Sequence, residues 1–230
     1  MTLITRLICI LMIAAPTGAA FAQGGSIQAP DDLNTCILCH GTPEFWKGDQ
    51  ARLYVDQNDL EGDVHFKKGL KCHDCHGGNP RSLDPAVAHS TRTSDVTPGD
   101  RPFQPFGEMT KSCGACHVDQ YAGMVDSVHG ATNTQRAQAN RPVTCNACHG
   151  DKAHAIVRVS DPASPVNARN QVRICGECHQ TELDEYSQSG HGYGLFRSGL
   201  DSAVCSDCHG AHGIFSSKDQ RSTLHSTKVA

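Results

Sequence analysis

The amino-acid sequence predicts a mainly α-helical fold with a high loop content and no substantial β-sheet. No segment keeps the two-residue alternation of apolar and polar side chains that a half-buried strand requires. Only 5% of the 230 residues are aromatic and 38% are hydrophobic, so a conventional apolar core would be thin. The chain also contains 13 cysteines and 14 histidines. These counts indicate that something other than hydrophobic side chains organises the interior.

The first element is an export signal, which we assign to residues 1–22. Arg6 supplies a positive charge, Leu7–Ala15 is a short apolar run, and Ala20-Phe21-Ala22 is a small-residue cleavage site. The apolar run is shorter than the roughly 20 residues of a transmembrane helix. An uncleaved N-terminal anchor is the alternative. We therefore expect an exported protein, in the periplasm or at the cell surface, from which Cys9 has been removed with the signal.

The charge and the hydropathy exclude two classes of protein. The formal net charge is -4 and no run of basic residues occurs, which excludes a strongly basic nucleic-acid binder. The mean hydropathy of -0.40 excludes a multispanning membrane protein.

All twelve remaining cysteines belong to the pattern Cys-x-x-Cys-His, which occurs six times. This pattern is the attachment motif of a c-type haem. Two thiols three positions apart lie on one side of a helical turn, where they can bond to the two vinyl groups of one haem. The histidine that follows then binds the iron as an axial ligand. Six covalently attached haem c groups are thus expected, on Cys36, Cys39, Cys72, Cys75, Cys113, Cys116, Cys145, Cys148, Cys175, Cys178, Cys205 and Cys208, with His40, His76, His117, His149, His179 and His209 as proximal ligands.

Two other kinds of site use similar cysteine patterns. Cysteines of exported proteins usually form disulfides, but a disulfide framework gives no reason for a histidine after every second cysteine. Zinc sites use Cys-x-x-Cys pairs, but they do not require a histidine as the fifth residue. At this composition chance would produce far fewer than one such motif, so covalent haem is the preferred interpretation.

The other histidines follow an internal repeat. A haem motif, a His-Gly pair, a second haem motif and a closing histidine occur from Cys113 to His154 and again from Cys175 to His212. The same order occurs with different gaps from Cys36 to His89. Each repeat therefore supplies two further histidines for its two irons, although the spacing does not tell which histidine binds which iron. The expected distal ligands are His65, His89, His129, His154, His191 and His212.

Two histidines and two methionines remain. For His73, which lies inside a haem motif, the simplest interpretation is an exposed or hydrogen-bonded side chain. His225 lies in a polar tail that we expect to be mobile, and its functional alternative is to bind a haem of a neighbouring subunit. Only Met109 and Met124 remain after signal removal, so most irons should have two histidine ligands and lower potentials than His/Met ligation would give.

The domain organisation follows the repeat. Proline-rich linkers separate the repeats, and the best candidates for helices are residues 120–128 and 182–188. After the signal at 1–22 we expect dihaem unit 1 with its linker at 23–100, unit 2 at 101–165, unit 3 at 166–215 and a polar tail at 216–230.

The chain resembles the multihaem c-type cytochromes. The motif order at Cys113–His154 and Cys175–His212 is similar to the doubled repeat of periplasmic cytochromes, including cytochrome c3-like proteins and the decahaem subunits of porin–cytochrome conduits. The resemblance extends over about residues 34–213. It implies a multihaem cytochrome c fold, with short helices wrapped around a packed array of bis-histidine haems. By haem count alone, the chain is also similar to hexahaem cytochromes that polymerise into extracellular filaments.

The expected function is single-electron transfer in a respiratory chain, with no catalytic residues. The expected partners are periplasmic or membrane redox proteins, such as a quinol-oxidising donor, a terminal reductase or an outer-membrane acceptor. Neither nucleic-acid binding nor a membrane span after signal cleavage is expected, and oligomerisation remains open. The alternatives are a multihaem reductase with one open haem acting on a small nitrogen or sulfur compound, and a filament subunit. The histidine count favours the carrier, because every iron can receive a second ligand.

Overall fold

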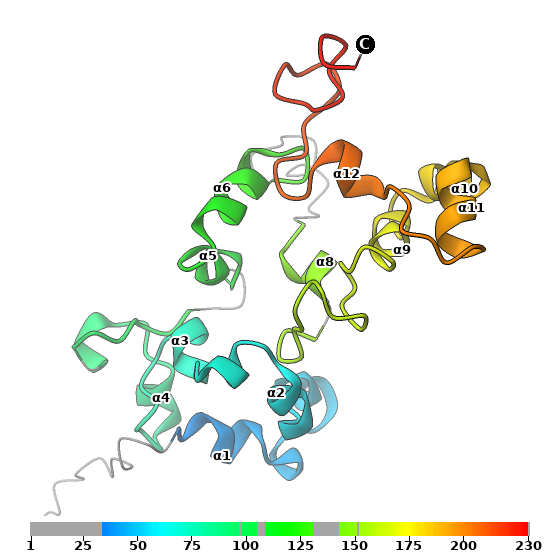
Figure 1. Ribbon diagram of the computed structural model, residues 1–230. Coiled ribbons are helices and arrows are strands. Elements are labelled where there is room, and N and C mark those ends of the chain that lie inside the picture. Colours follow the sequence, from blue (N-terminus) through cyan, green and yellow to red (C-terminus); the bar gives the residue numbers. More distant parts are fainter. Residues whose placement is uncertain (1–33, 97, 105–108, 131–142, 151, 230) are drawn as a thin grey trace, which may run out of the picture.

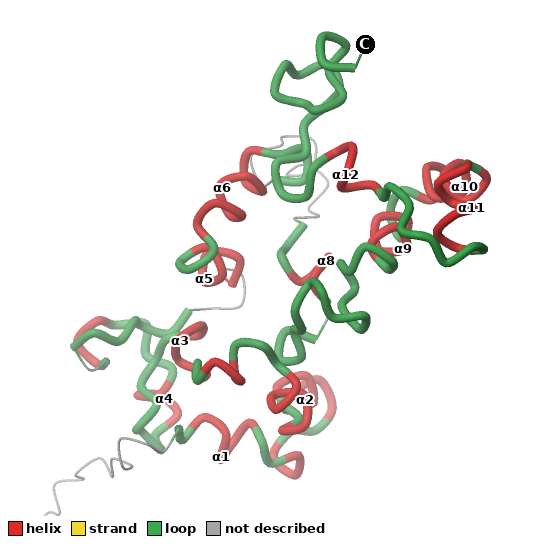
Figure 2. The backbone as a smooth tube through the Cα atoms, viewed as in Figure 1, coloured by secondary structure: helices red, strands yellow, loops and turns green. Residues whose placement is uncertain are grey.

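The computed structural model describes residues 34–96, 98–104, 109–130, 143–150 and 152–229. Within these ranges all regular elements are helices and none is a strand (Figure 1 and Figure 2). The prediction of a mainly α fold with a high loop content is therefore confirmed. The expected signal peptide lies outside the described residues.

The helices are short, and the longest of those described, α6 and α10, have nine residues each. Long loops and short 3-10 helices connect them. The helices are α1 (Cys36–His40), α2 (Gln57–Gly62), α3 (Cys72–His76), α4 (Pro85–Ala88), α5 (Met109–Gly114), α6 (Val118–Asp126), α8 (Asn146–His149), α9 (Gln171–Gly176), α10 (Gln180–Gln188), α11 (Gly190–Phe196) and α12 (Cys205–His209), and the 3-10 turns are Pro43–Phe45, Gly48–Leu53, Phe66–Lys68 and Thr93–Asp95.

Four of the six haem motifs form short helices of their own, namely α1, α3, α8 and α12. A carboxylate inside the motif stabilises the start of two of them. Asp74 Oδ2 accepts a hydrogen bond from the backbone N–H of Lys71 at 2.6 Å, and Asp207 Oδ2 accepts one from Val204 N–H at 2.8 Å. Each bond satisfies a backbone donor at the start of the helix, which is half of a capping box. The local sequence thereby holds the cysteine pair in a helical turn.

The other two motifs end a helix instead of forming one, because their second residue is a glycine in close contact with the next helix. α5 ends at Gly114, where a Cβ would lie 2.5 Å from Cγ of Tyr121 in α6. α9 ends at Gly176, where a Cβ would lie 2.4 Å from Cδ2 of Leu183 in α10. Side chains do not approach that closely, so glycine allows each pair of helices to pack.

The two helices expected between a haem motif and a following histidine are confirmed. Residues 120–128 were the predicted range of the first, which is α6, and residues 182–188 that of the second, which is α10. Both helices begin two residues earlier than predicted, directly after His117 and His179, which occupy their N-cap positions. A shift of this size is usual for helix boundaries.

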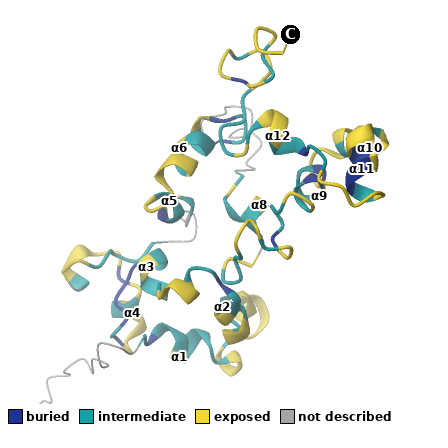
Figure 3. Ribbon diagram, viewed as in Figure 1, coloured by how far each residue is buried: buried dark blue, intermediate teal, exposed yellow. Residues whose placement is uncertain are grey.

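The apolar core is very small. Among the described residues, the buried hydrophobic side chains are Val172, Leu195 and Val204, with a few half-buried neighbours such as Tyr186 and Phe196. Figure 3 shows that buried segments are scattered along the chain and do not gather at one centre. A chain of this length normally buries most of its surface on folding. The polypeptide alone therefore does not supply the interior of a domain of this size.

The helices follow one another in an extended arrangement. In Figure 1, α1–α4 lie at the bottom of the molecule and α5 and α6 lie above them on the left. α8 lies in the middle, α9–α11 lie on the right, and α12 lies near the top, below the C-terminal tail. In the described ranges, no helix has the length and apolar character needed to cross a bilayer. The haem motifs are thus distributed along the whole length of the molecule.

We expect Gly176→Val to destabilise the protein by about 1–3 kcal/mol, because the added side chain must displace Leu183 and separate α9 from α10. The free energy of unfolding of the purified protein, measured in denaturant, tests this. Gly62→Ala is the matched control, because a Cβ at the end of α2 meets no atom within 4 Å. Equal stability of the two variants would contradict the close contact.

Candidate functional site

Five of the six motif histidines face a second histidine ring from a distant part of the chain. The ring centroids are separated by nearly the same distance in every pair, although the angles between the rings differ. The pairs are His40–His89 at 5.9 Å, His65–His117 at 6.0 Å, His76–His154 at 5.9 Å, His129–His179 at 6.0 Å and His149–His212 at 6.0 Å.

This common separation fits a metal ion held between two imidazoles. Metal–imidazole bonds are about 2.0–2.1 Å long, and a ring centre lies ~1.1 Å behind its nitrogen, so two axial ligands place their ring centres about 6 Å apart. Directly packed rings have no reason to keep one separation while their interplanar angles range from 4° to 81°. The donor set therefore fits six-coordinate haem iron.

The structure brings together most of the predicted ligands. His65, His89, His129, His154 and His212 each lie opposite a motif histidine. The sixth distal candidate, His191, has no histidine ring opposite it among the described residues, and neither has the sixth motif histidine, His209.

In three of the paired histidines, Nδ1 lies close to a backbone carbonyl oxygen or a carboxylate oxygen. His40 Nδ1 lies 2.8 Å from Leu53 O, and His89 Nδ1 lies 2.9 Å from Pro85 O. His65 Nδ1 lies 3.4 Å from Asp63 Oδ1. Such a partner fixes the ring orientation and leaves Nε2 for the metal. These contacts therefore prepare the rings as ligands.

Asp63 is a buried carboxylate, 4% exposed, that the sequence analysis did not identify. Its Oδ1 accepts a hydrogen bond from His65 N–H at 2.7 Å, and its Oδ2 accepts one from Ile156 N–H at 2.8 Å. Ile156 follows His154 by two residues. The carboxylate thus connects the segment of one distal histidine to the segment of another, and it positions both.

This connection has an equivalent further along the chain, and we call the two connections junctions. In each junction, the residue before one distal histidine donates a backbone hydrogen bond to the residue two positions after another. Val64 N–H donates to Ile156 O at 2.7 Å, beside His65 and His154, and Val128 N–H donates to Ile214 O at 2.8 Å, beside His129 and His212.

Burial keeps several of the paired histidines neutral. It lowers the pKa of His76 to about 4, and it also lowers the pKa values of His149, His154 and His212. The neutral imidazole is the form that binds a metal. Four of the paired rings are therefore in the ligating state at neutral pH.

No disulfide joins any of the twelve motif cysteines. The first cysteines of the two motifs in each repeat interact, which raises the pKa of one member and lowers the pKa of the other to about 7. These pairs are Cys36–Cys72, Cys113–Cys145 and Cys175–Cys205. The charge of Cys116 also acts on Cys75, and that of Cys178 acts on Cys148. Motifs that follow one another in the sequence are therefore neighbours in space.

Aromatic side chains enclose the first ring pair. The Trp46 ring stacks on His40 with centroids 4.8 Å apart, and Trp46 Nε1–H donates to Cys39 O at 2.9 Å. Phe103 packs edge-on against His89 at 4.9 Å. The pair therefore lies in a largely apolar environment.

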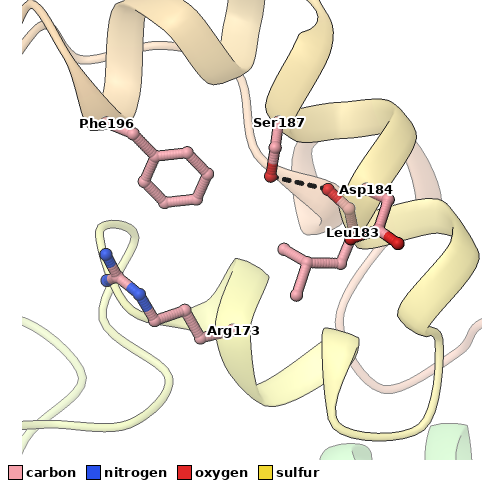
Figure 4. A pocket seen from close by; sticks show the side chains of 5 residues that line it. All are labelled: Arg173, Leu183, Asp184, Ser187 and Phe196. Carbon is pink, nitrogen blue, oxygen red and sulfur yellow. Dashed lines mark hydrogen bonds between the residues drawn. The ribbon is translucent and has the colours of Figure 1, made fainter.

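A separate pocket lies between α9, α10 and α11 (Figure 4). The guanidinium of Arg173 lies 5.0 Å from the centre of the Phe196 ring, and Ser187 Oγ donates to Leu183 O at 2.7 Å. Asp184 completes the lining, which contains no thiol and no imidazole. The described residues contain no cluster of three or more His, Cys, Asp or Glu side chains suited to a metal ion. The structure therefore offers pairs of imidazoles and not a tetrahedral ligand set.

A comparison with protein families agrees with this chemistry. Residues 81–150 match the family described as "Cytochrome c554 and c-prime". The matched stretch contains the third and fourth haem motifs and is similar to multihaem c-type cytochromes, which carry covalent haem c and transfer electrons. No curated protein and no solved structure matches the chain.

The pairing of distant histidines can be tested at His154, which faces His76. We expect His154→Ala to leave the haem content unchanged and to convert one haem to the high-spin state, because its iron loses one of two ligands. Electron paramagnetic resonance of the oxidised protein measures this.

His73→Ala is the matched control, since His73 lies in the same motif as His76 and its buried Nδ1 has no hydrogen-bond partner. This variant should stay low-spin. A low-spin spectrum for both variants would contradict the assignment of His154.

Proposed function

We propose that the chain is an exported hexahaem c-type cytochrome that relays single electrons between periplasmic or membrane redox proteins. Five histidine pairs with ring centres about 6 Å apart, each including a histidine of a Cys-x-x-Cys-His motif, carry this proposal. Three dihaem units, at residues 23–100, 101–165 and 166–215, organise the array. The thiol pairs Cys36–Cys72, Cys113–Cys145 and Cys175–Cys205 support this division, because each joins the two motifs of one unit.

The protein's residues have three tasks. The cysteines anchor the haem through thioether bonds, and the neutral histidines bind the iron from both sides. Contacts such as His40 Nδ1 with Leu53 O and the hydrogen bonds of Asp63 hold the rings in place. When bound, each haem supplies an iron that gains and loses one electron.

The order of the motifs supports a linear relay. Interactions between cysteines join the motifs within each unit, and Cys75 and Cys148 lie near the first motif of the following unit. Six redox groups then follow one another from the N-terminal to the C-terminal end. Because the chain carries a net charge of -4, basic redox partners and salt-sensitive encounters are expected.

A multihaem reductase is the second candidate, and one observation favours it. No histidine ring among the described residues faces His209, the last of the motif histidines. An iron with one protein ligand can bind a small nitrogen or sulfur compound. This candidate requires a high-spin haem in the purified wild-type protein.

The experiment is a count of haems per chain on the protein exported from a host with the c-type maturation system. We expect six haems by mass spectrometry and by a pyridine haemochrome assay, and a low-spin spectrum that nitrite and sulfite leave unchanged. A colourless protein, or one that contains zinc or disulfides, would overturn the proposal. A high-spin signal together with nitrite or sulfite binding would support the reductase.

The same proposal predicts that the chain does not fold without haem, because the three buried hydrophobic side chains of the described residues cannot offset the conformational entropy of so long a chain. A chain in which each motif cysteine is replaced by serine, and which binds no haem, should be digested by trypsin at least about tenfold faster than the loaded protein. Wild-type protein made with the maturation system is the control. Equal protease resistance would show that the polypeptide folds by itself.

A further inference from the structure

We infer that His225, in the C-terminal tail, is the second axial ligand of the haem attached at Cys205 and Cys208, opposite His209. The inference rests on the proposed function. It assigns to His225 the role of sixth distal iron ligand, which the repeat pattern gives to His191. His191 then binds none of the six irons.

The ring pairs follow a rule that connects each repeat to the next. The first motif of a repeat takes the middle histidine of the preceding one, as in His65–His117 and His129–His179. The second motif takes the closing histidine of the following repeat, and the pairs are His76–His154 and His149–His212. By this rule, His191, the middle histidine of the third repeat, would pair only with the first motif of a fourth repeat. The partner of His209 would come from residues after His212.

The segment around His191 also differs in conformation from its two equivalents. His65 and His129 both follow a valine that forms a junction hydrogen bond. His191 instead follows Gly190 and lies in the first turn of α11, where Ser189 Oγ accepts from Gly192 N–H at 3.1 Å. Its side chain is exposed. The segment therefore lacks the junction that orients the other two histidines.

The C-terminal tail, residues 216–229, is bound next to α12. Thr223 Oγ1 donates a hydrogen bond to the carbonyl oxygen of Cys208, the residue before His209. His225 follows Thr223 by only two residues. The tail expected to be mobile is thus hydrogen-bonded to the last haem motif, and His225 lies two residues from that contact.

Further contacts hold the start of the tail against α6. Arg221 forms an ion pair with Asp126 at the end of α6, and its guanidinium lies 4.1 Å from the centre of the Phe215 ring. Ser222 is buried, with 4% of its surface exposed. Lys228 Nζ donates to Arg221 O at 3.3 Å, which closes the tail into a loop around His225. The tail therefore has a defined path.

Contacts within its own segment hold the ring of His225, as they hold the ring of His89. His225 Nδ1 lies 2.8 Å from Thr227 Oγ1 and accepts a hydrogen bond from Thr227 N–H at 3.3 Å, whereas His89 Nδ1 lies 2.9 Å from Pro85 O. In both rings, a contact at Nδ1 with a neighbour on the same segment fixes the orientation of the ring.

The sequence carries a matching signal at the two ends of the array. His89-Ser90-Thr91-Arg92 and His225-Ser226-Thr227-Lys228 share the pattern His-Ser-Thr-basic, and the pair Arg-Ser precedes each of them, at Arg81-Ser82 and Arg221-Ser222. His89 faces His40 of the first motif. The first of the six motifs is thus faced by one copy of the pattern, and the inference assigns the other copy to the last of the six.

The test compares His225→Ala with His191→Ala in the full-length exported protein. We expect six haems in both variants, because the thioether bonds remain. Only His225→Ala should show one high-spin haem by electron paramagnetic resonance and bind carbon monoxide after reduction. His225→Met should restore the low-spin state and raise the potential of one haem.

The outcomes separate this inference from the proposed function. Fewer than six haems in the wild-type protein would overturn the proposed function. Six haems with a high-spin signal in His191→Ala, and none in His225→Ala, would overturn this inference alone. So would a wild-type monomer, isolated by size-exclusion chromatography with light scattering, that carries one high-spin haem, because His225 would then bind between chains.

Discussion

The pairing of two imidazoles at a fixed separation is the constraint on which the rest of the structure depends. The two members of each pair come from distant parts of the sequence, as with His76 and His154, so every pair closes a long loop. Closing a loop costs conformational entropy, and the few buried side chains of this chain cannot offset it. Metal ligation can offset this entropy cost, because the free energy of binding to a site that exists only in the folded state contributes directly to folding.

Local hydrogen bonds and close contacts at glycines orient the segments that carry the paired histidines. Asp74 and Asp207 stabilise short motif helices, and Gly114 and Gly176 allow two other motifs to turn directly into the next helix. Asp63 and the two junctions then bring the segments of the distal histidines together. None of these contacts buries much apolar surface. They fix the direction of side chains.

Much of this architecture could be predicted from the sequence, because it follows from local patterns. The helical character of the described residues, without strands, and the helices α6 and α10 follow from local sequence patterns. The haem-binding roles proposed for the cysteines and motif histidines follow from spacing and remain predictions. The pairing could not be predicted, since it depends on how repeats pack. Asp63 lies outside every motif, so its role became visible only in the fold. His191 fits the sequence repeat but lacks the junction, whereas the pattern shared by His89 and His225 was present in the sequence and was not recognised.

The position of His225 after all six Cys-x-x-Cys-His motifs has a consequence for biogenesis. A polypeptide is made and exported from its N-terminus, so this proposed ligand leaves the ribosome and the translocon later than every attachment motif. A product truncated between His212 and His225 would still carry the six motifs and could be loaded with cofactor, yet the iron at His209 would remain open to oxygen and peroxide. On the proposed assignment, the chemical inertness of the last haem therefore depends on synthesis of the tail.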